Sequence, residues 1–347
     1  MRAVRVTQWK HEPELVEIEA PEPGPGQVVI KVGGAGACHS DLHVTQADPT
    51  PGWHPPFTLG HETAGWVHQL GEGVDSLAVG QGVAVYGPWG CGTCERCRLG
   101  AETYCENNER APVSHGGAGL GADGGIADYM LVPDPRLLVP LPPGLDPVRA
   151  APLTDAGLTP YHAIRRSRAK LLPGTWAVVI GVGGLGHIAV QILKAITSAK
   201  VIAVDSKPEA LRLAEECGAD AVVPAGDAAA GEIRKLTPGG RGADLVVDFV
   251  GAAGTVELGM TVARPLGDVT IVGIANGTFA WSFFGVPYEA GLATTYWGTI
   301  PELAEVLELG AAGLVRPKIT QFPIEEAPAV YRRLDQGEIE GRAVFVP

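Results

Sequence analysis

Alternating hydrophobic and polar residues recur in short runs over the first 150 residues of the chain. Two of these runs lie at 27–32 and 82–86, and clusters of glycine and proline separate them from their neighbours. Alternation with a period of two is typical of half-buried strands, whereas glycine and proline favour turns. The pattern therefore predicts an all-β region from residue 1 to about residue 150.

From about residue 174 the pattern changes to continuous apolar runs, which alternate with helical segments of about ten to fifteen residues. This texture is typical of βαβ units that build a parallel sheet. We predict six strands in one doubly wound sheet, at 177–181, 201–205, 220–223, 243–250, 268–273 and 291–296. The change of pattern indicates a domain boundary between about 150 and 172.

The last fifty residues combine helical and strand patterns. The pattern predicts a helix around 302–307, a loop and second helix over 323–335, and a final strand at 343–346. This tail is too short to form a third domain. We therefore expect it to pack against the first domain.

Composition narrows the class of protein. The chain has 347 residues, 46% hydrophobic and 19% charged, so it can bury the cores of two domains. The formal net charge of −13 argues against a nucleic-acid partner, because such a partner requires a basic surface. The only local basic run, at 165–168, is expected to be a solvated helix end or a surface on the cofactor side.

No segment has the pattern of a targeting signal or a membrane span. The first six residues alternate like a strand, and the longest apolar stretch, 176–193, is interrupted by four glycines, His187 and Gln191. These features predict a cytoplasmic protein without a membrane partner. In that setting the six cysteines are expected to be metal-binding thiolates rather than disulfides.

Four cysteines lie close together, in the spacing Cys-x2-Cys-x2-Cys-x7-Cys. They are Cys91, Cys94, Cys97 and Cys105. Four thiolates in one short loop can close a tetrahedral zinc shell, which indicates a structural zinc site. A similar site can stabilise a nucleic-acid-binding or protein-binding module, and the acidic composition argues against the first of these alternatives.

Cys38 and His61 could form part of a second zinc site further upstream. Two ligands are too few to close a shell, so a third must come from elsewhere and a fourth position can stay open for water or substrate. An open position is what catalysis requires. The alternative is a buried apolar cysteine and an unrelated core histidine.

The glycine pattern at 181–186 follows a predicted strand and precedes a predicted helix at 188–196. In this context Gly181 permits a tight turn, Gly183 lets the backbone approach a pyrophosphate, and Gly186 allows close packing of the helix. Gly184 and Leu185 complete the loop. A plain strand-to-helix turn would have a similar pattern, but the surrounding βαβ texture favours a dinucleotide site.

Asp205 lies 24 residues after Gly181, at the end of the next predicted strand. A carboxylate there can accept hydrogen bonds from both ribose hydroxyls and would repel a 2′-phosphate, which favours NAD over NADP. Lys207 nearby weakens this preference. Asp205 could also cap the helix that begins at Pro208.

Two short runs extend this picture to a known family. The residues Cys-His-Ser-Asp-Leu-His at 38–43 and Gly-His-Glu at 60–62, together with the four-cysteine loop and the dinucleotide loop, resemble the zinc-dependent medium-chain alcohol dehydrogenases. The resemblance covers essentially the whole chain, and the nearest likeness is to bacterial NAD-dependent secondary-alcohol dehydrogenases. It implies a GroES-like catalytic domain with both zinc sites over 1–154, a Rossmann domain over 155–295 and a C-terminal return over 296–347.

The resemblance also implies the third ligand of the catalytic zinc. The segment 153–159 occupies the place where the family supplies this ligand, and here Asp155 stands where many relatives have cysteine. The implied ligand set is Cys38, His61 and Asp155, with two anions that balance the dication.

Further roles follow from the resemblance alone. A proton would pass to solvent through Ser40, the ribose hydroxyls of the cofactor and His43, and Glu62 would support the metal ligands or bind the metal transiently. The implied cofactor contacts are His39, Thr159, Val250, Val272, Ile274 and Arg342. The implied walls of the substrate pocket are Trp53, His54, Tyr296 and Trp297, although the last two could instead pack between domains.

We therefore expect a zinc-containing, NAD-dependent alcohol dehydrogenase with one catalytic and one structural zinc per subunit. Its substrates would be secondary alcohols and ketones, with primary alcohols and aldehydes also possible, and its active site would lie in the cleft between domains. Bacterial relatives suggest a homo-oligomer, either a tetramer or a dimer. The alternatives are a polyol or sugar dehydrogenase and a non-catalytic, zinc-stabilised NAD sensor.

Overall fold

The computed structural model describes all residues, Met1–Pro347, and the chain forms two compact units. The first unit contains Met1–Leu158, Gly298–Gly313 and Pro317–Pro347. The second contains Thr159–Trp297 and Leu314–Arg316. The C-terminal return therefore belongs mainly to the first unit.

The first unit is built around a seven-stranded sheet in the order β10-β6-β5-β3-β18-β17, in which β9 also pairs with β3. A three-stranded sheet, β2-β1-β4, and a two-stranded sheet, β7-β8, complete its strands. The strands are β1 Arg2–Val6, β2 Glu14–Glu17, β3 Val28–Gly36, β4 Phe57–Thr58, β5 Glu62–Leu70, β6 Gly82–Val85, β7 Gly117–Ala118, β8 Gly121–Ala122, β9 Tyr129–Val132, β10 Leu138–Pro140, β17 Ile319–Pro323 and β18 Arg342–Val346. The region before residue 150 is therefore mainly β as predicted, but it is not all-β, because helix α1 His39–Gln46 and shorter helices lie within it.

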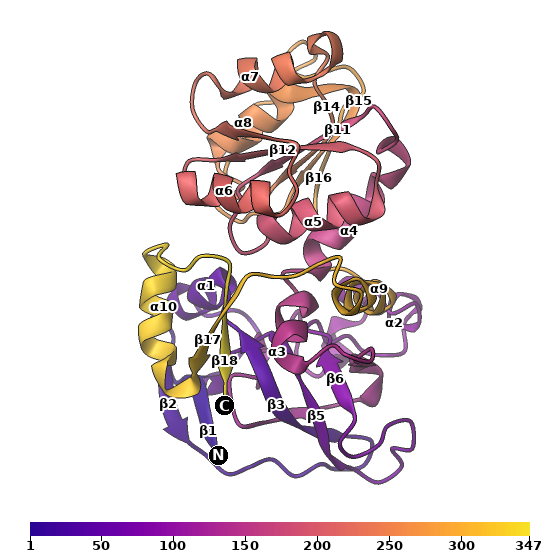
Figure 1. The fold of residues 1–347 in the computed structure, drawn as a ribbon. Coiled ribbons are helices and arrows are strands. Elements are labelled where there is room, and N and C mark those ends of the chain that lie inside the picture. The colour runs from indigo at the N-terminus through magenta and orange to yellow at the C-terminus, as the bar shows by residue number, and fades with distance from the viewer. The chain divides into compact units, whose positions relative to one another are not determined.

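Strand β18 joins the end of the chain to its beginning, because it pairs antiparallel with β3 through Val344 opposite Gly36 and Phe345 opposite Ala35. Figure 1 shows the yellow strands β17 and β18 beside the indigo and purple strands of the same unit. Strands β3 and β18 are rich in valine, and most of their residues are buried. The C-terminal residues are therefore part of the core of the first unit.

Short helices connect and cover these strands. They are the α-helices α1 His39–Gln46, α2 Glu95–Arg98, α3 Pro147–Ala150, α9 Ile300–Ala311 and α10 Ala327–Asp335, and the 3-10 helices η1 Glu102–Tyr104, η2 Asn108–Arg110, η3 Pro135–Leu137, η4 Ala151–Thr154 and η7 Ile324–Glu326. Helix α9 begins with a capping box in which the Thr299 hydroxyl accepts the Glu302 amide and the Glu302 carboxylate accepts the Thr299 amide. Both predicted C-terminal helices are confirmed.

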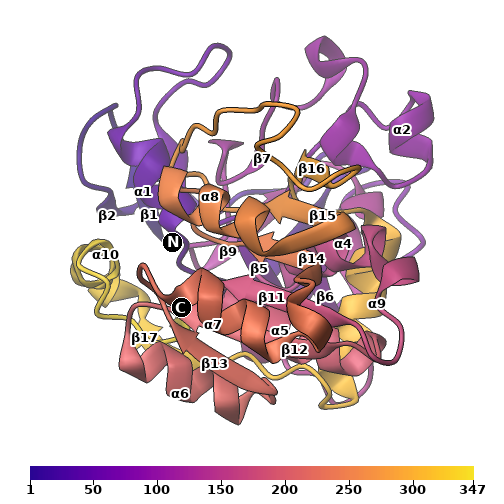
Figure 2. The same cartoon turned by 90° about the horizontal axis from the view of Figure 1, so that it is seen from above.

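The second unit is a six-stranded parallel sheet in the order β13-β12-β11-β14-β15-β16. Its strands are β11 Trp176–Ile180, β12 Lys200–Asp205, β13 Ala221–Pro224, β14 Ala243–Asp248, β15 Ala263–Ile271 and β16 Gly291–Thr294. Figure 2 shows this order, with β13 and β16 at the two edges. The predicted doubly wound sheet is confirmed.

Helices cover both faces of this sheet (Figure 1). They are α4 Leu158–Arg166, which starts at the boundary between the units, α5 Gly186–Ile196, α6 Pro208–Glu216, α7 Ala229–Leu236 and α8 Ala253–Val262, with the 3-10 helices η5 Arg168–Lys170 and η6 Pro238–Gly240. Buried valine and isoleucine side chains of β11, β12 and β14 form the core beneath some of them. None of the helices in the chain combines the length and the apolar character that a bilayer crossing requires.

One strand differs clearly from the prediction. Strand β15 begins at Ala263, five residues before the predicted start at Asp268. The early part pairs Ala263 with Ala243, and the register then shifts before Asp268 pairs with Leu245. Leu266 has a positive φ of 65° within this irregular stretch. The irregularity interrupts the apolar pattern, which is why the pattern detects only the second half of the strand.

The glycine loop provides a test of this packing. A Cβ on Gly186 would lie 1.8 Å from the Gly181 carbonyl oxygen, whereas a Cβ on Gly183 would have no neighbour within 4 Å. We expect Gly186→Ala to lower the free energy of unfolding by about 2 kcal/mol or more. The matched change Gly183→Ala should alter it by less than ~0.5 kcal/mol. Denaturant unfolding of the two variants measures the difference, and equal stabilities would contradict the assigned packing.

Candidate active site

Four side chains from three separate stretches of the first unit meet in its interior. They are Cys38, His61, Glu62 and Asp155, all buried, and their ligand atoms all lie within 4.8 Å of one another. Cys38 is the N-cap of α1, His61 directly precedes β5, Glu62 is the first residue of β5, and Asp155 follows η4. The sheet and the two helix ends therefore assemble a possible metal site.

The spacing of the three predicted ligands suits zinc. Asp155 Oδ2 lies 4.0 Å from Cys38 Sγ and 3.5 Å from His61 Nε2. A tetrahedral shell with bonds of about 2.0–2.3 Å separates its ligand atoms by about 3.3–3.8 Å. The distances between the thiol, imidazole and carboxylate atoms are therefore close to those that a bound zinc ion would require.

The charge of the site also suits a cation. Burial on its own would lower the pKa of the His61 imidazole, but the nearby carboxylates of Asp41 and Asp155 raise this pKa well above its usual value. Without a metal, the ring therefore keeps a proton among negative groups. A bound dication would replace that proton, and the pH dependence of metal binding would follow from this exchange.

Asp41 holds the outer nitrogen of His61. Its Oδ1 atom lies 3.1 Å from His61 Nδ1, and its Oδ2 atom accepts the Cys38 amide at 3.0 Å. A carboxylate on the outer nitrogen fixes the tautomer and leaves Nε2 to face the metal. No role of Asp41 was predicted from the sequence, although its place three residues after a helix N-cap is a signal for a capping carboxylate.

Glu62 forms a buried ion pair with Arg342 of β18, in which Arg342 Nη2 donates to Glu62 Oε1. The other oxygen, Oε2, is buried and accepts no hydrogen bond from the protein. Burial raises the pKa of the Glu62 carboxyl to about 7, against the lowering effect of Arg342. The neighbouring Gly36 leaves the space for this side chain, since a Cβ there would lie 2.0 Å from Oε2. Glu62 thus presents an unused acceptor beside the three ligands.

The four-cysteine loop forms the second cluster of the first unit. The sulfur atoms of Cys91, Cys94, Cys97 and Cys105 all lie within 4.8 Å of one another, and none of the six cysteines of the chain forms a disulfide. Backbone amides point at these sulfurs: the Thr93 and Cys94 amides lie 3.4 Å from Cys91 Sγ, and the Cys91 amide lies 3.3 Å from Cys105 Sγ. Amide donors stabilise thiolates, which suits a closed metal shell.

An ion pair that sequence reasoning missed lies beside this cluster. Arg136 Nη1 donates to the buried Glu102 carboxylate at 2.6 Å, and Arg136 Nη2 donates to the Gly90 carbonyl at 3.1 Å. The loop is also tied to helix α9, because the Ile300 amide donates to the Gly100 carbonyl at 2.8 Å. The cluster is thus anchored to the C-terminal return.

In the second unit, the glycine loop follows β11 and opens α5. Gly181 has a φ of +83°, which favours glycine, and Gly183 leaves open space above the loop. Asp205 supports the loop directly: its Oδ2 accepts the Val182 amide at 2.7 Å and its Oδ1 accepts the Lys207 amide at 2.9 Å. The N-cap of α6 is Lys207, so Asp205 is not the cap of that helix.

The matches to known proteins agree with both units. The family model described as "Alcohol dehydrogenase GroES-like domain" matches residues 24–143, and the one described as "Zinc-binding dehydrogenase" matches residues 184–318. The NAD-dependent alcohol dehydrogenase of Sulfolobus acidocaldarius is 36% identical to this chain over 366 residues, with 99% of each chain covered. The chain belongs to the zinc-dependent medium-chain alcohol dehydrogenase family.

Two other relatives show the range of this family. The D-arabinose 1-dehydrogenase (NADP(+)) of Saccharolobus solfataricus is 33% identical, over 100% of this chain and 97% of that protein. The solved structure of acetophenone reductase from Geotrichum candidum, in complex with NAD, is 32% identical with a TM-score of 0.85, over 99% of this chain and 96% of that one. The family and the fold expected from the sequence motifs are confirmed.

Other residues predicted from the family resemblance lie in several places. Ser40 is half-buried with Oγ 3.6 Å from Cys38 Sγ, while His39 and His43 are exposed on α1. Trp53 is half-buried and donates to the Ser114 carbonyl at 3.0 Å, and His54 is exposed. Their predicted roles in proton transfer, cofactor contact and the substrate pocket stay predictions.

The predicted cofactor and pocket residues of the second unit also differ in exposure. Val250 and Ile274 are exposed and Val272 is half-buried, at the carboxyl ends of β14 and β15 where doubly wound sheets bind ligands. Of the other residues predicted in this unit, Thr159 and Trp297 are buried and Tyr296 is exposed. Arg342, an expected cofactor contact, is buried in the first unit beside Glu62.

The four-cysteine cluster can be tested through stability and metal content. We expect Cys94→Ser to remove one of two zinc ions and to lower the free energy of unfolding by about 3 kcal/mol, because metal binding and local folding are coupled. Elemental analysis and chemical denaturation measure the two effects. The matched change Cys217→Ser lies outside both clusters and should leave both quantities nearly unchanged. Full zinc content and stability in Cys94→Ser would contradict the structural role.

Proposed function

We propose that this protein is a zinc-dependent enzyme that transfers a hydride between alcohols and NAD, and so interconverts alcohols with ketones or aldehydes. The observation that carries the proposal is the buried set of Cys38, His61 and Asp155, whose donor atoms and spacing suit zinc. The same chain carries a glycine loop supported by Asp205. A metal centre and a dinucleotide loop are the two requirements of this reaction.

The residues of the first unit would prepare the alcohol. A zinc ion held by Cys38, His61 and Asp155 would supply a Lewis acid that lowers the pKa of an alcohol hydroxyl. The two anionic ligands balance the dication, and Asp41 keeps His61 oriented. Ser40, two residues after Cys38, would accept the alcohol proton while its own proton passes through the ribose hydroxyls of the cofactor to the exposed His43, which would deliver it to water.

The residues of the second unit would hold the cofactor. The open space at Gly183 and the first turn of α5 suit a pyrophosphate, since the first amides of a helix have no intrahelical partners. The Asp205 carboxylate would accept hydrogen bonds from the ribose hydroxyls and disfavour a 2′-phosphate, so we propose NAD rather than NADP.

The Gly183→Ala variant offers a separate check of this loop. The added methyl group should weaken NAD binding while leaving the fold intact.

Secondary alcohols and ketones are the proposed substrates, and primary alcohols are possible. The likeness to a solved acetophenone reductase with NAD supports this preference. The relative named as an NADP-dependent D-arabinose dehydrogenase supports the rival, a sugar or polyol dehydrogenase. A non-catalytic NAD sensor is a third candidate, and it predicts bound zinc and NAD without turnover.

A substrate panel decides among these candidates. We expect NADH formation with a 2-alkanol and a 1-aryl-ethanol to exceed that with a 1-alkanol or a polyol. Asp155→Ala should reduce turnover ~10²-fold or more, because ligand loss weakens metal binding at least as much as loss of a supporting residue. The control Asp75→Ala removes an exposed carboxylate of the same unit and should have no effect. Preference for the polyol would favour the sugar branch, and no turnover with both groups bound would favour the sensor.

We further propose that the protein is cytoplasmic and forms a homo-oligomer through the β16 edge of its second unit. Strand β16 has a neighbour on one side only (Figure 2). The segment before it exposes four aromatic side chains: Trp281 is 56% exposed, Phe283 73%, Phe284 86% and Tyr288 59%. Exposed apolar patches and unpaired strand edges mark association sites. Six cysteines without a disulfide agree with a reducing compartment.

Sedimentation of the purified protein tests the association. We expect a dimer or tetramer, and the double change Phe283→Glu with Phe284→Glu should shift it toward monomer, because two charges would be buried without partners. Val79→Glu, at a 65% exposed position of the first unit, is the matched control and should keep the native size. A monomeric wild-type protein would contradict the proposal.

A further inference from the structure

We propose that Tyr331 of the C-terminal helix α10 is a positioning residue for the metal site, because its hydroxyl holds Asp41 and Asp41 holds the ligand His61. The proposal rests on the metal site proposed above. It assigns a function to a buried hydroxyl that lies outside every motif found in the sequence. The residues involved come from distant parts of the chain.

The contacts form a continuous chain. The Tyr331 hydroxyl donates to Asp41 Oδ2 at 2.7 Å, and the Cys38 amide donates to the same oxygen at 3.0 Å. The other oxygen, Oδ1, lies 3.1 Å from His61 Nδ1. All three side chains are inaccessible, with exposed fractions of 0% for Asp41, 1% for His61 and 2% for Tyr331. One buried carboxylate thus connects two proposed metal ligands with the C-terminal helix.

The second donor matters because of how an aspartate rotates. The terminal torsion of aspartate has a broad, shallow profile, so one hydrogen bond from the Cys38 amide restrains the carboxylate only loosely. The Tyr331 hydroxyl approaches the same oxygen and fixes the plane of the group. That plane directs Oδ1 to His61. Burial and the Asp41 charge raise the pKa of Tyr331 well above its usual value, so the hydroxyl keeps its proton and remains a donor.

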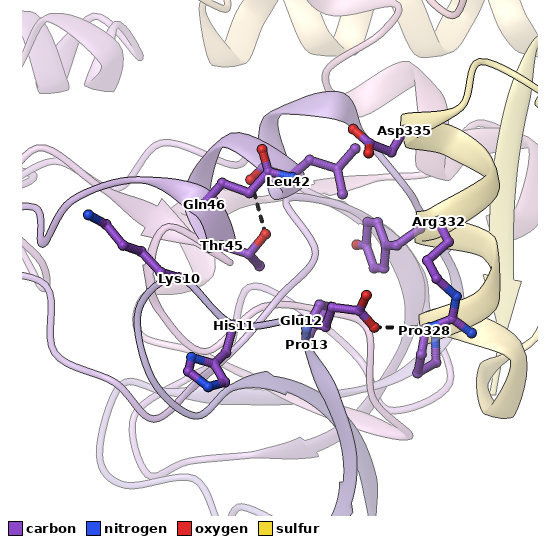
Figure 3. A pocket seen from close by; sticks show the side chains of 11 residues that line it. Lys10, His11, Glu12, Pro13, Leu42, Thr45, Gln46, Pro328, Arg332 and Asp335 are labelled. Carbon is purple, nitrogen blue, oxygen red and sulfur yellow. Dashed lines mark hydrogen bonds and ion pairs between the residues drawn. The ribbon is translucent and has the colours of Figure 1, made fainter.

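The Tyr331 side chain is almost fully buried, and its ring has an aromatic neighbour in β18. Its ring lies 5.9 Å from that of the buried Phe345 in β18. On another side the residue lines a cavity of about 180 Å³, which is also lined by Leu42 and Thr45 of α1. Figure 3 shows this cavity, with the ion pair of Arg332 and Glu12 spanning from α10 to the N-terminal segment.

The cavity explains why the hydroxyl is needed. One water molecule needs only about 10–15 Å³ of a cavity volume measured for the centres of water molecules, so this cavity has room for several waters or for a displaced ring. Without the bond to Asp41, the ring could move toward this space and water could reach the carboxylate. The orientation of His61 would then be less well defined, and the metal would be held less tightly.

Metal release from the holoprotein tests the inference. We expect Tyr331→Phe to speed the release of zinc to a chromogenic chelator from the catalytic site by ~10-fold, with release from the four-cysteine cluster unchanged. Release from the two sites should give two kinetic phases. The phase that is absent in the Cys38→Ala variant belongs to the catalytic site. Phenylalanine keeps the ring and its contact with Phe345, and near-ultraviolet circular dichroism verifies that the fold is retained.

The control is Tyr86→Phe. Tyr86 is fully buried in the same unit, and its hydroxyl donates to the Gly298 carbonyl, away from Asp41. This change should cost similar stability without speeding release from the catalytic site. Equal release from that site in both variants would overturn the inference, since it would indicate a general loosening of the fold.

A double-mutant cycle with Asp41→Asn gives a second measurement. If Tyr331 acts through Asp41, adding Tyr331→Phe to Asp41→Asn should change the release rate by less than ~2-fold. The same ~10-fold effect in both backgrounds would overturn the inference. A wild-type protein that binds a single zinc ion would instead overturn the proposed metal site, whereas two bound ions with unchanged release in Tyr331→Phe would overturn only the role of Tyr331.

Discussion

Concentrated negative charge in the interior is the constraint on which the first unit depends. Cys38, Glu62 and Asp155 bring a thiol and two carboxyls together in the interior, around the imidazole of His61. Buried charges of one sign are costly unless cations and hydrogen bonds compensate them. Here Arg342 pairs with Glu62, and the protonated His61 or a bound metal compensates the rest.

The C-terminal return has a chemical role in addition to its packing. It supplies Arg342 from β18 and Tyr331 from α10, and both reach the residues around the metal ligands. Its helix α9 also contacts the four-cysteine loop, because the Ile300 amide donates a hydrogen bond to the Gly100 carbonyl. The last fifty residues therefore support both clusters, which explains why they belong to the first unit.

The two units divide the chemistry between them. The first contains the side chains that suit zinc and the residues that would carry a proton, and the second contains the loop that suits a dinucleotide. Neither is sufficient for hydride transfer. The relatives of this chain include proteins named for alcohols, a sugar and an aryl ketone.

The sequence by itself determined the features that are local along the chain. The four-cysteine spacing, the strand-loop-helix order at Gly181–Gly186 and the six parallel strands follow from patterns within a few neighbouring residues, so they could be predicted directly. Asp155 was reached only through family resemblance. Only the tertiary structure decided three side-chain contacts around the metal ligands: Asp41 with His61, Arg342 with Glu62, and Tyr331 with Asp41. The last two contacts join residues that are 280 and 290 positions apart, and no local pattern encodes such contacts.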